Sequence, residues 1–145
     1  MIMRDGRIGL VGVVQQVRRG TAIGLDWSHP DFRVSAVTVD GLVSGIVEPR
    51  RGLFREGDRL LLNAAPYYGS LEPGTLIVTS GLGGVYPRGI PVGEVVELAE
   101  QEGRWRKAYW LRPVAGIGSV THVLVVVGDS VPEGMMERFV EEGGE

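Results

Sequence analysis

The chain has 145 residues, of which 43% are hydrophobic and 23% are charged, as is usual for a folded domain. Residues 129–145 carry six acids and one base, so the tail has a net charge of −5. The remaining 14 bases and 12 acids give residues 1–128 a charge of +2, too little to support nucleic-acid binding. The absence of cysteine excludes disulfides and thiolate metal sites.

Short apolar runs separated by Gly, Pro and Asp clusters predict β-strands along most of the chain. Nine strands are expected, at residues 8–17, 21–26, 34–40, 43–48, 59–63, 75–79, 92–99, 108–112 and 120–127. After Pro132 the pattern predicts either a short helix or a disordered acidic tail.

Nine short strands at this spacing favour an all-β fold of two small β-barrels. The first barrel is expected at residues 6–68, the second at 69–128, and the acidic tail at 129–145. Strands can cross between two such barrels, so the boundary near residue 68 is the least determined part of this prediction.

The most distinctive segment is a strand, a glycine-rich loop and a second strand at residues 74–95. Glycine permits positive φ and close backbone approach, whereas proline fixes φ and removes a donor. Phosphate-binding loops lead into a helix N-terminus, but a strand follows here, which disfavours an anion site. A structural connection is the favoured interpretation, with a partner-binding loop as the second.

The run from Thr79 to Val95 resembles the hallmark of the MreC family of rod shape-determining proteins. That hallmark reads T-S-G-hydrophobic-G-G-hydrophobic-aromatic-P-x-G-hydrophobic-P-V-G-x-V. The resemblance extends over about residues 6–127, through 9–14, 25–30, 60–62 and 123–126, but Thr75 stands where the family usually has Asp. The matching motif residues, structural or interfacial, are Thr79, Ser80, Gly81, Gly83, Gly84, Pro87, Gly89, Pro91 and Gly93.

This resemblance implies a non-catalytic scaffold of bacterial cell-wall elongation that maintains rod shape. It implies an N-terminal membrane helix and a dimerising coiled coil, both missing from this sequence, with the barrels on the extracytoplasmic (periplasmic) side of the cytoplasmic membrane. The implied partners are an elongation penicillin-binding protein, MreD, MreB, RodZ and further copies of the protein. No cofactor, metal ion or nucleic acid is expected.

A serine nucleophile is the enzymatic alternative, because the barrels of this family resemble those of chymotrypsin-like proteases. Ser28 lies next to His29, and Ser80 could use His122, with an Asp as the orienting acid. Adjacent strand residues point to opposite faces, which disfavours direct pairing of Ser28 with His29. Ser80 lacks the Gly-x-Ser-x-Gly elbow. We therefore expect no catalytic residues.

Aromatic and basic residues alternate at 104–112, a pattern that single-stranded nucleic-acid platforms also use. One face of this strand is expected to be core and the other solvated, with arginine stems covering apolar surface. Trp, Tyr and Arg also dominate protein-binding hot spots. The candidate partner surface therefore comprises Trp105, Arg106, Tyr109 and Trp110. The alternative function is a ligand-binding barrel for an oligosaccharide or oligonucleotide, with these side chains lining a concave pocket.

Overall fold

The computed structural model describes residues 2–4, 7–50, 59–66, 69–103, 106–116, 118 and 120–127, with backbone alone at 2–4 and 7. Within these residues the chain forms ten β-strands. None of the described residues forms a helix with the length and apolarity needed to cross a membrane. The strands are β1 (Ile2–Arg4), β2 (Arg7–Gly9), β3 (Gly12–Arg18), β4 (Thr21–Asp26), β5 (Val34–Thr38), β6 (Ser44–Arg50), β7 (Arg59–Ala64), β8 (Leu76–Thr79), β9 (Pro91–Glu102) and β10 (Arg106–Pro113).

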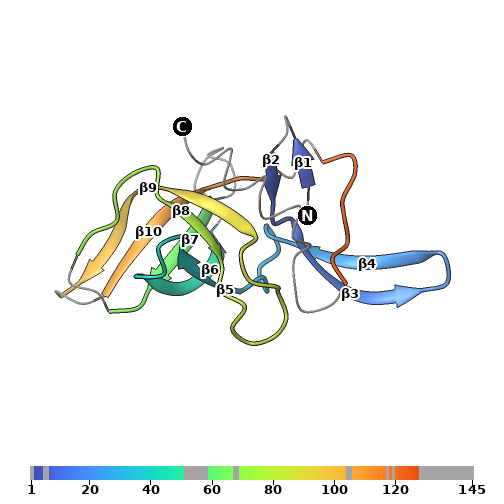
Figure 1. The fold of residues 1–145 in the computed structure, drawn as a ribbon, viewed down its shortest axis with the longest axis horizontal. Helices are drawn as coiled ribbons and strands as arrows, with labels where there is room; N and C mark the ends of the chain where they lie inside the picture. Colours follow the sequence, from blue (N-terminus) through green and yellow to red (C-terminus); the bar gives the residue numbers. More distant parts are fainter. Residues whose placement is uncertain are drawn as a thin grey trace.

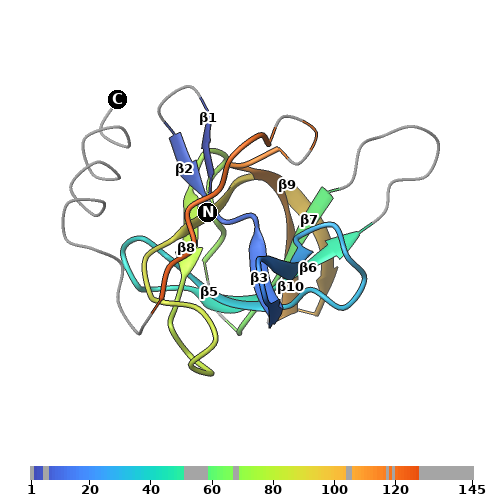
Figure 2. The ribbon, with the colours of Figure 1, turned by 90° about the vertical axis from the view of Figure 1, so that its right-hand side faces the viewer.

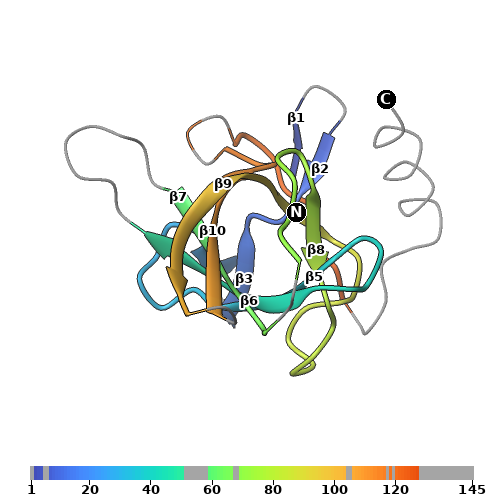
Figure 3. The same ribbon diagram turned by 90° about the vertical axis from the view of Figure 1, so that its left-hand side faces the viewer.

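Six of these strands close into a barrel in the order β10-β7-β6-β5-β8-β9, and the end-on views in Figure 2 and Figure 3 show the ring. Every neighbouring pair is antiparallel. Side chains alternate between the two faces, so Leu60 and Leu62 of β7 point into the barrel core. The rest of this core is apolar and buried: Ile8, Leu10, Trp27, Phe32, Val34, Ala36, Val47, Ile77, Ile90, Val92, Val95, Tyr109 and Leu111.

Two smaller sheets, β1–β2 and β3–β4, are attached to one side of this barrel. The β3–β4 hairpin extends away from it in Figure 1. Its base is fixed by Leu10 N, which donates to Pro91 O at 2.7 Å, and by Trp27 N, which donates to Val11 O at 2.8 Å. The buried Trp27 Nε1 also donates to Ala115 O at 2.8 Å, so the N-terminal sheets are held to the chain that follows β10.

The all-β prediction is confirmed for the described residues, but the expected pair of barrels is not: the structure has one closed barrel and two hairpin sheets. β5, β6 and β7 precede residue 68, whereas β8, β9 and β10 follow it. The predicted boundary therefore falls inside the barrel, because β7 pairs with β10 and β5 pairs with β8 across it.

Two further expectations concern the C-terminal part. The strand predicted at 120–127 is wrong, since these residues form no ladder, although they run past the base of β3–β4 (Figure 1). The predicted helix or disordered tail after Pro132 lies outside the described residues. Apolar alternation identifies a segment that can be extended, but it does not show whether a partner strand lies beside it.

Candidate protein-binding site

The family-motif loop between β8 and β9 is closed at its neck by Thr79, which is fully buried. Thr79 Oγ1 donates to Pro87 O at 2.5 Å and accepts from Ile90 N at 2.9 Å. The Thr79 backbone N–H donates to Ile90 O at 2.8 Å, and Thr79 O accepts from Gly89 N at 2.9 Å. Thr79, at the start of the loop, thus forms hydrogen bonds with backbone groups at its end, so the loop follows a defined path without a helix.

The motif glycines explain how the chain turns within this loop. Gly81, Gly83, Gly84 and Gly89 all have positive φ, between 71° and 95°, where a side chain would be strained. Gly93 has a different role in β9, because a Cβ atom there would lie 2.8 Å from Arg112 O on the neighbouring strand. Ser80 belongs to the turn as well, since its Oγ accepts from Leu82 N at 3.2 Å.

Tyr86 anchors the loop to the barrel. Its ring packs edge-on against the buried Phe32, with centroids 6.2 Å apart and planes at 71°. Burial raises the pKa of Tyr86 to about 12 from its ordinary value of 10.0. The neighbouring Val85 points outward and is 63% exposed, so the loop presents an apolar side chain beside a fixed aromatic one.

An open apolar groove of about 440 Å³ lies between this loop, the base of the β3–β4 hairpin and the extended segment after β10. Among its described lining residues only Asp26 carries a charge, and Asp26 Oδ1 already accepts from Ser28 N at 2.8 Å. A concave apolar surface of this kind suits an apolar polypeptide segment better than a sugar or an anion. The lining residues are 10–14, 24–26, 85–87, 90 and 123–126.

The β3–β4 hairpin adds further exposed apolar surface to this region. Val14, Val17 and Ile23 are 40%, 77% and 45% exposed, and they come from both strands. Within the described residues β3 pairs only with β4. A two-stranded sheet with both edges free is marginally stable alone, and such edges accept additional strands. The hairpin and groove together form the candidate protein-binding site.

The partner surface predicted on β10 is only partly assembled. Trp105 lies outside the described residues. Tyr109 does not belong to an exposed partner surface, which corrects the prediction: strand alternation turns its side chain into the barrel, where it is 3% exposed. Its hydroxyl accepts a hydrogen bond from Leu71 N at 3.2 Å. Trp110 lies on the outer face, under the Arg59 guanidinium at 5.7 Å from the ring centroid. Arg106 is exposed, 3.9 Å from Glu102.

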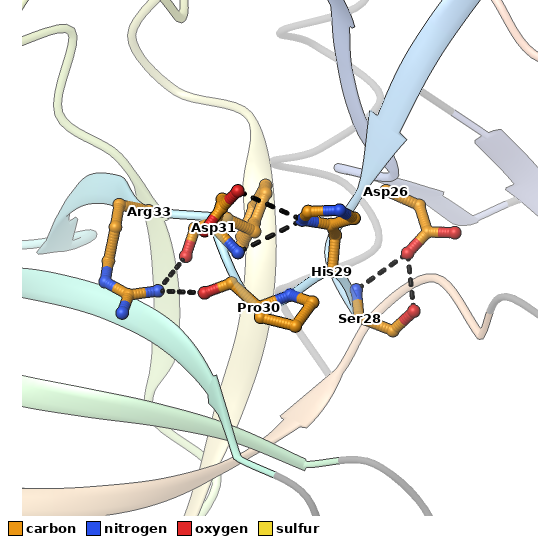
Figure 4. A network of polar contacts seen from close by, with 7 residues as sticks. Asp26, Ser28, His29, Pro30, Asp31 and Arg33 are labelled. Carbon is orange, nitrogen blue, oxygen red and sulfur yellow. Dashed lines mark hydrogen bonds and ion pairs between the residues drawn. The ribbon is translucent and has the colours of Figure 1, made fainter.

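The residues considered as a serine triad make other contacts (Figure 4). Ser28 Oγ donates to Asp26 Oδ1 at 2.5 Å, and His29 Nδ1 accepts from Asp31 N at 3.1 Å. His122 Nδ1 lies 3.1 Å from Thr121 Oγ1. In the described part of the chain, the hydrogen bonds of the candidate serines therefore go to carboxylate or backbone groups and not to a histidine. This network shapes the turn between β4 and β5.

The motif loop can be predicted from the sequence, whereas the groove cannot. Its walls come from three segments far apart in the chain, and the strand pattern gives no sign that they meet. The one signal in the sequence is the unbroken apolar run Val123-Leu124-Val125-Val126, whose lack of polar alternation also fits the strand predicted there.

The described residues thus define a β-barrel protein, with one closed six-stranded barrel and an open apolar groove at its side. The family described as "Rod shape-determining protein MreC, barrel core" matches residues 3–127. The chain therefore belongs to the MreC family, as the motif at 79–95 predicted.

Relatives and solved structures agree with this assignment. Cell shape-determining protein MreC from Bacillus subtilis and from Geobacillus stearothermophilus is 36% identical over 59 residues, 41% of this chain. The chain spans only 20% of the length of these relatives. The crystal structure of MreC from Pseudomonas aeruginosa superposes with a TM-score of 0.60 at 28% identity, covering 74% of this chain and 66% of that one.

A further solved structure is a complex between penicillin-binding protein PBP2 and MreC from Helicobacter pylori. It superposes with a TM-score of 0.55, covering 77% of this chain and 70% of that one. Its identity of 20% supports the fold alone.

Proposed function

We propose that this chain is a non-catalytic scaffold of cell-wall elongation that binds the extracytoplasmic region of a penicillin-binding protein through the groove and the β3–β4 hairpin. The apolar groove is the observation that supports the proposal, because it offers a surface that a protein segment would cover. The family is one of shape-determining proteins. The Helicobacter pylori relative was solved with PBP2, which suggests the class of partner.

The remaining parts of the proposal follow from the family. They comprise self-association, contacts with MreD, MreB and RodZ, and a location outside the cytoplasmic membrane by means of an N-terminal anchor. The ligand-binding alternative is not favoured by a specific observation. Tyr109 faces the core and Trp110 faces outward, so these two rings do not line one pocket.

A charge placed in the groove tests the site. Val85 and Leu82 lie in the same loop and are 63% and 69% exposed, but only Val85 lines the groove. We expect Val85→Asp to weaken binding to the purified extracytoplasmic region of the penicillin-binding protein about tenfold or more, since a carboxylate would be buried without a partner. Leu82→Asp is the matched control and should bind like the parent.

The alternative is that the partner binds the outer face of β10. If Trp110→Ala abolishes binding and Val85→Asp does not, the interface lies on β10, as the sequence pattern predicted. If the parent protein binds no penicillin-binding protein in calorimetry or pull-down, this choice of partner is wrong.

A further inference from the structure

We infer that the partner segment joins the β3–β4 hairpin as an added β-strand along the outer edge of β4, with acidic residues beside Arg18 and Arg19. This inference rests on the proposed function of the hairpin and groove as a protein-binding site. It names the edge that is used, the conformation of the bound segment and the charge of that segment.

The two edges of the hairpin are not equivalent. β3 contains a bulge at Gln15, which has no register partner in β4. A bulge twists the edge of a strand and interrupts its hydrogen-bonding pattern, so it disfavours the addition of another strand. β4 is unbroken over Thr21–Asp26, contains no proline and pairs only with β3 in the part of the chain that the structure describes. The edge of β4 is therefore the better template.

The register shows which backbone groups of β4 point outward. Trp27 N donates to Val11 O at 2.8 Å, and bonded and non-bonded pairs alternate along an antiparallel ladder. Two positions further along β4 is Asp26's neighbour Leu25, a bonded position, and the next residue, Gly24, is non-bonded. The N–H and C=O of Gly24 therefore point away from β3, and those of Ala22 do the same two residues further on.

These outward groups are available to a ligand. Ala22 and Gly24 are both exposed, and within the described residues neither forms a backbone hydrogen bond outside the β3–β4 ladder. β4 thus presents two donors and two acceptors in the spacing of a strand, on the part of the hairpin that extends away from the barrel in Figure 1. An extended segment can pair with these groups, whereas a helix has already used its own.

The hairpin carries charge of one sign only at its tip. Arg18 and Arg19 lie at the turn, and residues 12–25 contain no acid. Arg18 Nη2 donates to the neutral Gln16 Oε1 at 3.3 Å. A strand beside β4 would reach the turn about 10 Å from Gly24, which lines the groove. We therefore expect apolar residues of the bound segment at the groove and acidic residues near the tip.

The first test uses the full chain and a synthetic peptide of about eight alternating valine and glutamate residues with blocked ends, the length of an ordinary strand. We expect saturable binding by NMR, with amide exchange slowed at Ala22 and Gly24 but not at Val17, whose N–H faces the other edge. Lysine in place of glutamate should weaken binding about tenfold, since like charges then meet at the tip. Without saturable binding, or with protection only at other residues, the inference is wrong.

A matched pair of proline variants identifies the edge. Val17 and Ala22 are register partners, so Ala22→Pro removes an outward N–H from β4 and Val17→Pro removes one from β3. Proline is tolerated in an edge strand where the N–H faces solvent, and the dispersion of the amide spectrum verifies that both variants are folded. We expect Ala22→Pro to weaken peptide binding about fivefold, as for one lost hydrogen bond, and Val17→Pro to leave it unchanged. Equal effects of the two variants would overturn the inference.

The same variants distinguish this inference from the proposed function. If the penicillin-binding protein binds the parent and Ala22→Pro equally well but Val85→Asp poorly, the groove is used without strand addition, and only the inference fails. If the peptide binds along β4 as expected and the penicillin-binding protein does not bind at all, the edge accepts a strand, and only the choice of partner is wrong.

Discussion

At the scale of single residues, Thr79 connects the barrel to the motif loop. Thr79 is fully buried, and its hydroxyl bridges two backbone groups of the loop, Pro87 O and Ile90 N. A side chain of similar shape without the hydroxyl would leave both groups unpaired, which costs more than the net value of the hydrogen bonds themselves.

We therefore expect Thr79→Val to lower the free energy of unfolding by about 1–3 kcal/mol, measured by urea denaturation. Thr75→Val is the matched control, because the exposed Thr75 hydroxyl donates to Glu72 O at the surface. A loss of similar size in both variants would mean that the buried bridge has no special role.

Tyr86 gives a pH dependence whose sign follows from its burial. The pKa of Tyr86 is raised to about 12 in the folded protein from 10.0, so the unfolded chain loses this proton first. Stability is therefore fully present below pH 10 and falls as the pH rises from about 10 to 12. The loss stays below the ~1.4 kcal/mol expected per pKa unit, because the ring is only partly buried.

Tyr86→Phe should remove this part of the alkaline loss while leaving stability at pH 7 nearly unchanged. The test is to measure the urea unfolding midpoints of both proteins at pH 9 and pH 11 and to compare how far each midpoint falls. The same alkaline drop in the variant and the parent would show that other groups cause it.

At the scale of elements, the backbones of β6 and β7 approach each other closely at Gly45. A Cβ atom at Gly45 would lie 2.3 Å from Asn63 O and 3.0 Å from Ala64 Cα, both on the paired strand. Neither backbone atom can move without disturbing the ladder, so the two strands fit only around glycine.

Gly45→Ala should therefore cost about 1–3 kcal/mol of stability by thermal or urea unfolding. The exposed neighbour Ser44 provides the control, and Ser44→Ala should change stability by less than about 0.5 kcal/mol. A neutral Gly45→Ala variant would show that β6 and β7 can separate without loss.

The elements also show what a sequence pattern can reveal. Alternation predicted β4 at Thr21–Asp26 with its exact bounds, and β7 to within one residue, because both are short runs flanked by turn residues. The same pattern merged β2 and β3 into one strand at 8–17, although residues 10 and 11 interrupt it. It also made residues 120–127 a strand, since pairing is a property of the whole sheet.

The candidate site also has one part that the sequence predicts and one part that it does not. The loop could be predicted, because Gly and Pro restrict the backbone locally and the motif is specific. The groove could not, because Leu25, Val85 and Val126 meet only after the barrel has closed. Tyr109 and Trp110 were grouped by residue type, and only their register in β10 separates a core ring from an outer one.

At the scale of the whole molecule, barrel closure joins the two halves of the chain. Three barrel strands lie before residue 68 and three after it, and two of the six seams, β7–β10 and β5–β8, cross this point. Each half alone would have unpaired edges and an exposed core face, so neither meets the requirement of a complete apolar core.

Separate expression of residues 1–68 and 69–145 should accordingly give two unfolded chains with poorly dispersed amide NMR spectra, and mixing them should restore the native spectrum if the halves recognise each other. A break in the β3–β4 turn, after Gly20, is the matched control: it leaves all six barrel strands on one piece, which should retain a dispersed spectrum. A well-dispersed spectrum from residues 69–145 alone would mean that this half forms an independent core, and would favour the two-barrel division over the single closed barrel.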